Sequence, residues 1–342
     1  MDSADILRLI DALPGRRVAV VGDVVADEFV YGRVARVSRE APVLILEYDS
    51  TQVVPGAAGN AANNVAAMGG SALLASVVGR DEPARRLIQA LHPRVNPRML
   101  VRPARRATTV KTRILAGGIH SAKQQVVRID RVGGGALDAA TRQAFFRAAV
   151  SAALRSDAVL VSDYGGGLVS PAMVTTLRAE VKRAGHPVPI LIDSRHRLLS
   201  YRGLTACTPN ESEVEQALGV RINDDLRVLE RAGRAILAQT RMQAVLVTRG
   251  SRGMALFTPR TPTVHIPIFG SDEIADVTGA GDTVMATLTL ALAAGATFEL
   301  AARLANYAGG LVVMKRGTAT VSASELRDAV GRDSAGGPRR RG

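Results

Sequence analysis

This chain of 342 residues has very little cysteine, no tryptophan and no long apolar run. It has one cysteine, Cys207, and no tryptophan, so an internal disulfide is excluded and Cys207 is most simply a small buried hydrophobe. No run of about 20 apolar residues occurs. The acidic start has neither the basic segment nor the apolar run of a secretory signal. We therefore expect a cytoplasmic protein that does not interact with membranes.

Aromatic residues and lysines are also scarce. Aromatic residues make up 3% of the chain, and only four of its 44 basic residues are lysines, while the formal net charge is +13. Clustered cations bind nucleic acid by releasing counterions from phosphates, but these arginines recur along the whole chain, and few aromatic rings are available for base stacking. Nucleic acid is therefore not an expected partner. The positive charge favours small anionic substrates instead.

Apolar residues make up 47% of the chain, which is enough for a large core. Short runs rich in Val and Ile alternate with longer helical patterns such as 171–184 and 226–240. The apolar runs are 17–21, 72–78, 158–162, 189–193 and 244–248. Strands that are apolar on both faces and separated by helices predict a parallel sheet covered on both sides. The expected fold class is therefore a three-layer α/β/α protein with a mostly parallel sheet.

Two segments, 31–48 and 108–130, break this rhythm because polar and apolar residues alternate in them. Period two is typical of half-exposed strands. We interpret them as a small β-sheet that forms a lid on a single domain over 1–327; the alternative is that they are edge strands of the main sheet. The basic tail, 328–342, is expected to be disordered.

The strongest local motif is Asp-Val-Thr-Gly-Ala-Gly-Asp-Thr at 276–283, which precedes the apolar stretch 284–294. Amides of Gly279, Ala280 and Gly281, together with the positive end of the following helix, would form an anion hole. Asp282 would then take the proton from a substrate hydroxyl as it attacks the γ-phosphate of ATP. The alternative is a plain helix start, where these residue types are favoured for capping alone.

Small and polar residues gather at two further places early in the chain. The segment 55–64 is predicted to be a glycine-rich turn before a helix, and its Gly56 and Asn60 suit a polyhydroxylated ligand. Asp23 and Asp27 follow the strand at 18–21, and carboxylates at the end of a parallel strand are well placed for sugar hydroxyls. Helix capping is the alternative role for the two aspartates.

Asn210 and Glu213 open a helix after another apolar run. They could position Mg²⁺ through its water ligands, since this ion keeps most of its hydration, or they could form a capping box; the two roles are compatible. A third strand ends in the turn Thr248, Arg249 and Gly250, where a phosphate or ribose could bind.

Taken in order along residues 15 to 327, these motifs resemble those of the ribokinase-like (pfkB) sugar kinases. Within that family, segments 20–23, 36–43, 161–164 and 246–249 are similar to the kinase domain of the bifunctional heptose enzyme of ADP-heptose synthesis. The resemblance implies a ribokinase-like fold. It also implies phosphorylation of the anomeric O1 hydroxyl of D-glycero-β-D-manno-heptose 7-phosphate, with ATP and Mg²⁺ as cofactors.

The resemblance assigns roles to individual residues. It makes Asp282 the base and places Asp276 near a monovalent cation such as K⁺. On the nucleotide side it implies Asn210, Glu213, Thr248, Arg249, Gly250, Thr278 and Asn306. On the sugar side it implies Asp23, Asp27, Gly56, Asn60, Lys111, Arg128 and Asp163. The cations Lys111 and Arg128 suit a phosphorylated sugar; the alternative is that they are solvated strand charges.

Three positions depart from the heptose-kinase pattern. Gly166 stands where a lysine is usual, Ala57 replaces the second glycine of a Pro-Gly-Gly turn, and Ser194-Arg195 replaces Pro-Lys after Asp193. The five histidines form no His-x-Gly-His pair, so we expect a kinase without a nucleotidyltransferase domain. An apolar lid face predicts a homodimer. Another sugar or nucleoside kinase of the family, or an inactive sugar- or nucleotide-binding regulator, remains an alternative.

Overall fold

A large, mostly parallel β-sheet organises the body of the protein. The structure is a computed structural model that describes residues 3–117, 123–133, 135–270, 276–315 and 317–334. Across the sheet the strand order is β14 (Val264–Ile266), β13 (Met254–Phe257), β12 (Ala244–Thr248), β11 (Ala206–Cys207), β10 (Ile190–Ser194), β9 (Ala158–Asp163), β1 (Arg17–Gly22), β4 (Ser71–Val77) and β5 (Val95–Asn96), and β6 (Leu100–Val101) also pairs with β4. Only β13 and β14 run antiparallel to their neighbours.

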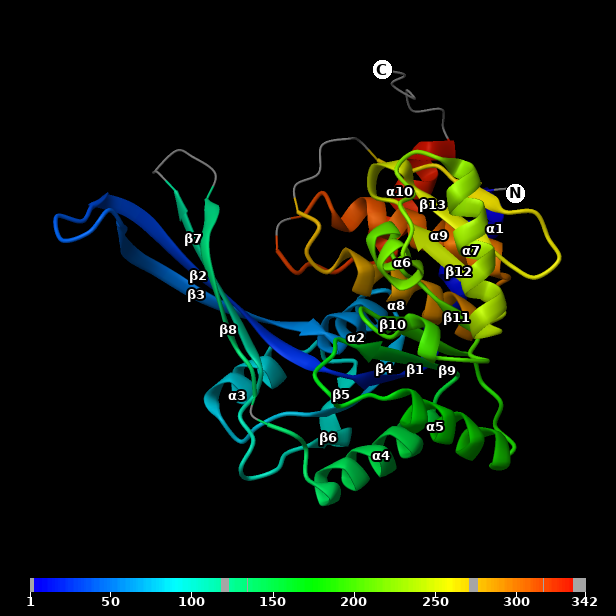
Figure 1. The fold of residues 1–342 in the computed structure, drawn as a ribbon, viewed down its shortest axis with the longest axis horizontal. Helices are drawn as coiled ribbons and strands as arrows, with labels where there is room; N and C mark the ends of the chain where they lie inside the picture. Colours follow the sequence, from blue (N-terminus) through cyan, green and yellow to red (C-terminus); the bar gives the residue numbers. More distant parts are fainter. Residues whose placement is uncertain (1–2, 118–122, 134, 271–275, 316, 335–342) are drawn as a thin grey trace.

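Helices cover both faces of this sheet (Figure 1). One face carries α4 (Ala139–Ala153), α5 (Pro171–Arg183), α6 (Glu211–Leu218) and α7 (Leu226–Thr240). The other carries α1 (Ser3–Ala12), α2 (Ala58–Ala67), α3 (Glu82–Gln89), α8 (Ala280–Ala293), α9 (Phe298–Val312) and α10 (Ala323–Ser334). Side chains of β1 alternate between two cores, Val18 and Val20 in one and Ala19 and Val21 in the other. The three-layer α/β/α prediction is therefore confirmed.

A second sheet of four strands projects from the body (Figure 1). Its order is β3 (Leu44–Ala57), β2 (Val24–Val37), β7 (Val110–Gly117) and β8 (Gln124–Arg131). The small sheet predicted from the period-two segments is confirmed, although β2 begins before and β3 ends after the predicted segment 31–48. Part of the predicted lid, 118–122, lies outside the described residues.

Strand register separates the two faces of this lid. Asp27, Lys111 and Asp130 lie in one row across β2, β7 and β8, and the row of Arg113 and Arg128 lies two residues further on the same face. Residues in between, such as Val127 and Ile129, point to the opposite face because strand side chains alternate. One face of the lid is therefore charged and the other partly apolar.

Two predicted boundaries are wrong. The tail expected to be disordered from residue 328 is helical as far as Ser334, because Leu326, Ala329 and Val330 of α10 pack into the core; residues 335–342 lie outside the described part of the chain. The predicted turn 55–64 is instead the end of β3 joined directly to α2 at Ala57. Among the described residues, no helix has both the length and the apolar character needed to cross a membrane.

Candidate active site

Asp282 lies in the first turn of α8 and is 4% exposed. Two side chains donate hydrogen bonds to its carboxylate: Asn60 Nδ2 to Oδ2 at 2.9 Å and the Tyr164 hydroxyl to Oδ1 at 2.8 Å. Asn60 comes from α2 and Tyr164 follows β9, so three elements distant in sequence fix one carboxyl group. Asn60 was predicted to lie near a sugar, whereas its amide nitrogen contacts Asp282 directly.

The pKa of Asp282 is raised to about 6. Burial is the main cause, because removal from water disfavours the charged form, and the negative charge of Asp27 adds to it. The hydrogen bonds from Asn60 and Tyr164 and the charge of Arg195 act in the opposite direction. A carboxylate with this pKa is ionised at neutral pH and basic enough to accept a proton.

The turn before Asp282 has the geometry of an anion site. Gly279 adopts the left-handed region at φ 78°, and a Cβ there would lie 2.5 Å from Asn60 Nδ2, so this position requires glycine. Within the described residues, the backbone N–H groups of Gly281 and Asp282 donate to no protein acceptor. Gly281 is exposed, so these two amides and the positive helix end can receive an oxyanion.

Asp27 lies at the base of the lid and is 6% exposed. It forms an ion pair with Arg113 of β7. A Cβ on Gly56 would lie 2.0 Å from Asp27 Oδ2, so glycine leaves room for this carboxylate. The structure thus brings Asp27 and Gly56 together, as the sugar-side prediction requires, with Arg113 as an unpredicted partner.

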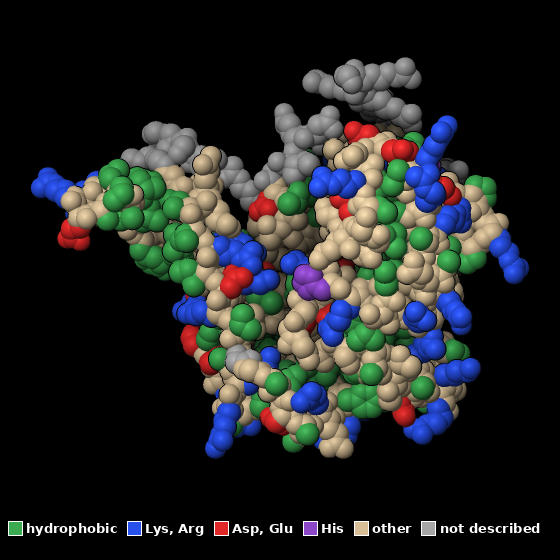
Figure 2. Space-filling view, viewed as in Figure 1, with side chains coloured by type: hydrophobic (Ala, Val, Ile, Leu, Met, Phe, Trp, Pro, Cys, Tyr) green, Lys and Arg blue, Asp and Glu red, His purple; other side chains and the backbone are tan. Residues whose placement is uncertain are grey.

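The ring of Tyr164 lies between Asp282 and two cations. Lys111 Nζ is 5.6 Å and Arg195 Cζ is 4.2 Å from the ring centroid. Burial lowers the pKa of Lys111, and the positive charge of Arg195 lowers it further. Arg128 lies on the same lid face, where it forms an ion pair with Asp130. In Figure 2, Lys and Arg side chains gather on the lid where it faces the body.

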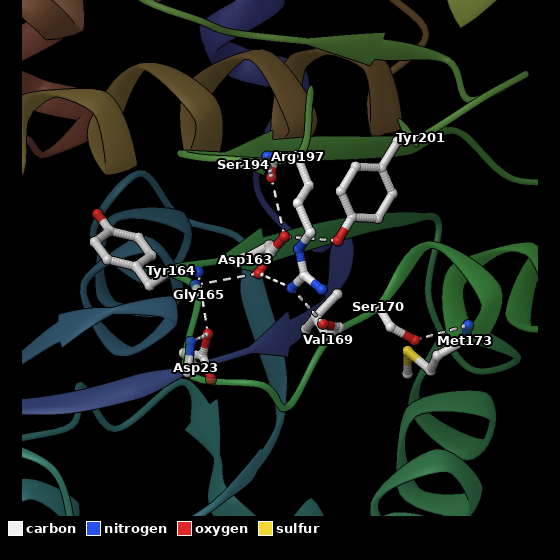
Figure 3. Close-up of polar contacts among 11 residues, drawn as sticks. Asp23, Asp163, Tyr164, Gly165, Val169, Ser170, Met173, Ser194, Arg197 and Tyr201 are labelled. Atoms are coloured by element: carbon white, nitrogen blue, oxygen red, sulfur yellow. Dashed lines mark hydrogen bonds and ion pairs between the residues drawn. The ribbon is translucent and has the colours of Figure 1, made fainter. Parts of the chain in front are cut away.

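Asp163 was predicted to lie on the sugar side, and neighbouring protein groups surround its carboxylate. Its carboxylate accepts hydrogen bonds from Ser194 Oγ at 2.9 Å, the Tyr201 hydroxyl at 2.7 Å and Arg197 at 2.9 Å, and also from the Gly165 amide. Figure 3 shows these groups converging on it, while the ring of Tyr164 points away. Each carboxylate oxygen of Asp163 therefore accepts two hydrogen bonds, which occupies both of its lone pairs. Asp163 therefore fixes the loops beneath the site.

Asp23 lies next to this network. Its Oδ2 accepts the backbone N–H groups of Tyr164 at 3.0 Å and Gly166 at 3.2 Å (Figure 3). Burial is the main cause that raises the pKa of Asp23, and these two amides lower it in part. Asp23 Oδ1 receives no hydrogen bond from the described residues, so it retains an acceptor for a ligand hydroxyl.

The nucleotide side begins at α6. Asn210 caps this helix, and the reciprocal bonds to Glu213, both 2.9 Å, form the predicted capping box. Burial raises the pKa of Glu213. Desolvation also raises the pKa of Asp193 to about 8, and the like charges of Glu213 and Asp282 contribute. Three carboxylates therefore share one region, and a cation would relieve their repulsion.

Other predicted nucleotide contacts are spread over neighbouring loops. Thr248 pairs with Asn210 as an isolated bridge, so the ends of β12 and β11 meet, and Gly250 begins the next turn. Arg249 is already paired within the protein, because its Nε donates to Glu211 at 2.7 Å and its side chain is only 8% exposed. In α9, the Asn306 amide donates to the Pro267 carbonyl at 2.8 Å, which leaves its side-chain oxygen for a ligand.

Asp276 shapes the loop before the anion site. Its carboxylate accepts N–H groups of Thr278 at 2.8 Å and Gly317 at 3.0 Å. Burial works to raise the pKa of Asp276, but the hydrogen bonds outweigh it, so the pKa is lowered and the group stays ionised. Residues 271–275 lie outside the described chain.

Three functional residues were missed or undervalued at the level of sequence. Arg113 alternates with Lys111 on the same lid face, and that spacing was the signal that could have found it. Tyr164 belongs to a recognised motif, but nothing local predicts its bond to Asp282. Arg195 was noted only as a departure from a pattern. Its position beside Tyr164 depends on how β9 and β10 pair.

Comparison with known sequences finds relatives that are longer than this chain. Bifunctional protein HldE of Caulobacter vibrioides is 42% identical over 331 residues, which are 95% of this chain and 65% of the relative. Bifunctional protein HldE of Geobacter metallireducens is 39% identical over 314 residues, 91% of this chain and 62% of the relative. The chain thus spans less than two thirds of the length of these proteins.

Solved structures share the fold. Ribokinase of Arabidopsis thaliana complexed with ribose and ATP has a TM-score of 0.70 at 19% identity, covering 93% of this chain and 99% of that one. Phosphofructokinase-2 of Escherichia coli in complex with potassium has a TM-score of 0.71 at 17% identity, covering 93% and 98%. Residues 16–325 match the pfkB family carbohydrate kinases. The chain therefore belongs to the pfkB family of carbohydrate kinases, which are phosphotransferases with an alcohol group as acceptor.

Proposed function

We propose that this protein uses ATP to phosphorylate the O1 hydroxyl of D-glycero-β-D-manno-heptose 7-phosphate, with Asp282 as the general base. The observation that carries the proposal is the buried Asp282 carboxylate, whose pKa is about 6, directly beside the unpaired amides of α8. The heptose-kinase motifs of the sequence and relatives named HldE at about 40% identity support the choice of sugar.

In the proposed reaction, Asp282 takes the proton of the O1 hydroxyl as O1 forms a bond to the γ-phosphorus of ATP. The bond from that phosphorus to the bridging oxygen breaks, and its electron pair leaves with ADP. Asn60 and Tyr164 each donate to a different oxygen of Asp282, so the carboxylate is held in one orientation. The amides of Gly281 and Asp282 stabilise negative charge on the transferred group.

The donor set on the nucleotide side fits Mg²⁺. Asp193 and Glu213 offer hard oxygen ligands, and the described residues contain no cluster of three or more potential metal-ligating side chains. An ion that needs few protein ligands and keeps its waters matches this set. When bound, Mg²⁺ would neutralise phosphate charge. Asp276 is ionised and accepts the amides of Thr278 and Gly317 and the Thr278 hydroxyl, so it retains a lone pair for a monovalent cation such as K⁺.

The lid supplies cations for the 7-phosphate of the proposed substrate. Lys111, Arg113 and Arg128 share the face that is turned to the body. Arg113 is paired with the buried Asp27, and Arg128 with the exposed Asp130. A phosphate dianion can receive bidentate hydrogen bonds from either guanidinium. The lid would thus recognise a sugar that already carries a phosphate.

The test is a substrate panel in which release of ADP is measured. We expect turnover with heptose 7-phosphate and little with ribose, fructose or fructose 6-phosphate. Activity on an unphosphorylated sugar, and none on heptose 7-phosphate, would favour the alternative of another sugar kinase of the family. Absence of ADP release with every sugar would favour an inactive binding protein.

The variant Asp282→Asn tests the proposed general base directly. We expect it to lower kcat by roughly 10²-fold or more, the usual contribution of a general base. Because a buried charge is removed, thermal unfolding at pH 8 should occur at no lower temperature than in the wild type. Unchanged turnover in this variant would exclude Asp282 as the base.

We also propose that the apolar face of the lid forms a homodimer. Among its exposed side chains are Val127 and Ile129, and Figure 2 shows hydrophobic side chains gathered on the lid. Exposed apolar surface of this kind usually marks an interaction site.

A further inference from the structure

Arg195 differs from the other arginines around the site because none of the described carboxylates pairs with it. It follows β10, and its Cζ lies 4.2 Å from the centroid of the Tyr164 ring. No described residue forms a hydrogen bond or ion pair with its guanidinium. By contrast, Arg113, Arg197 and Arg249 are each paired with a carboxylate. A stacked, exposed guanidinium keeps all its donors free.

Its position is between the base and the nucleotide side. The Tyr164 hydroxyl donates to Asp282 at 2.8 Å, so the guanidinium lies one aromatic ring away from the base. The positive charge of Arg195 also lowers the pKa of Asp282. In the proposed reaction the phosphoryl group moves to the hydroxyl that Asp282 deprotonates, so it comes close to this cation.

A second cation reaches the same ring from the lid. Lys111 Nζ lies 5.6 Å from the Tyr164 centroid, and it too has no carboxylate partner among the described residues. Arg195 and Lys111 repel each other, since the charge of Arg195 lowers the pKa of Lys111. Two unpaired cations beside one base form a site that an anion would stabilise.

Gly166 supplies no cation in this protein. A Cβ there would lie 2.6 Å from Asp23 Oδ1, so a longer side chain would require the Asp23 carboxylate to shift. Arg195 reaches the ring of Tyr164 from the carboxyl end of the neighbouring parallel strand, since Ser194 of β10 pairs with Asp163 of β9. The cation therefore comes from β10 in this protein.

We propose that Arg195 is a catalytic residue that donates hydrogen bonds to the phosphoryl group transferred from ATP, with Lys111 as its neighbour from the lid. The inference rests on the proposed phosphoryl transfer, but not on which sugar accepts the group. Two parallel N–H donors suit two oxygens of a phosphoryl group, which a point charge would not match. Stabilising the charge on this group as it moves accelerates transfer.

The first test measures nucleotide binding and needs no sugar. Titration calorimetry with Mg²⁺ would compare ADP with a non-hydrolysable ATP analogue for the wild type, Arg195→Lys and Arg195→Gln. We expect Arg195→Gln to weaken binding of the analogue by about tenfold, as for a lost charged contact, while ADP binding changes by less than about twofold. The affinity of Arg195→Lys for the analogue should lie between those of the wild type and Arg195→Gln. Equal losses for both nucleotides, or none, would overturn the assignment.

The second test measures turnover with whichever sugar the panel identifies. Loss of Arg195 should lower kcat by about 10²-fold, the usual effect of removing one transition-state donor, and leave KM for the sugar nearly unchanged. Arg202→Gln, an exposed residue on the loop after β10, is the control and should behave as the wild type. An effect on the KM of the sugar alone would contradict a contact with the transferred group. If no sugar is turned over, the proposed function fails while the binding comparison still decides the role of Arg195.

Discussion

Asp282 must be deprotonated to act as a base, and burial together with four neighbouring residues sets the pH at which this occurs. Its pKa of about 6 predicts that kcat/KM is constant at neutral pH and falls about tenfold for each pH unit below 6. The Tyr164 hydroxyl stabilises the charged form by its hydrogen bond. Burial alone would place the pKa higher still.

The variant Tyr164→Phe tests whether the Tyr164 hydrogen bond lowers the pKa of Asp282. Removing the donor destabilises the carboxylate, so the acid limb of the kcat/KM profile should move to higher pH, and activity at pH 6 should fall more than activity at pH 8. The measurement is a pH–rate profile with thermal unfolding as the folding control. A limb that stays in place, or moves to lower pH, would show that Tyr164 does not hold the ionised base.

At the scale of elements, the junction of β3 and α2 carries backbone strain. Ala57 adopts φ 53° and ψ −125°, a region that favours glycine, because the strand must turn into the helix within one residue. The turn brings α2 close enough for Asn60 to reach Asp282. The strain is therefore stored beside the active site.

The variant Ala57→Gly should relieve this backbone strain. Strain of about 1–3 kcal/mol is removed, while the greater chain entropy of glycine in the unfolded state offsets about 0.5–1 kcal/mol. We expect a net gain of about 1 kcal/mol in the free energy of unfolding, measured by denaturant titration. Ala62→Gly, in the middle of α2, is the matched control and should destabilise by at least about 1 kcal/mol. If both variants destabilise equally, Ala57 is not strained.

At the scale of the whole molecule, the exposed lid face predicts self-association. Val127 and Ile129 are 44% and 49% exposed, and register places them on the face opposite the cations. Light scattering should give about twice the chain mass at micromolar concentration. Val127→Lys with Ile129→Lys should give a monomer, because burying two charges at an apolar interface is unfavourable. Val132→Lys, just beyond β8, is the control; a monomeric wild type would contradict the dimer.

Local features of the site were predictable from spacing alone. The capping box of Asn210 and Glu213 joins residues three apart, and the Gly279 turn precedes its own helix. The two cores also follow from side-chain alternation, since β1 is apolar on both faces. Each of these depends on interactions within a few residues, so the sequence carries the information directly.

Contacts between distant segments were not predictable in the same way. Asn60 and Asp282 are 222 residues apart, Arg113 and Asp27 are 86 apart, and Arg249 and Glu211 are 38 apart. The same residue types would fit either a ligand or a protein partner. Only packing selects between them, as the four donors around Asp163 show.

The sequence by itself determined the layered fold, the strands of the small sheet and the helix start that carries Asp282, because periodicity and short-range motifs encode them. Tertiary structure alone decided which charges are already paired. It assigned Asp163 and Arg249 to internal contacts and left Arg195 free beside Tyr164. The physical reason is that a charge becomes available to a substrate only when the folded chain provides no partner for it.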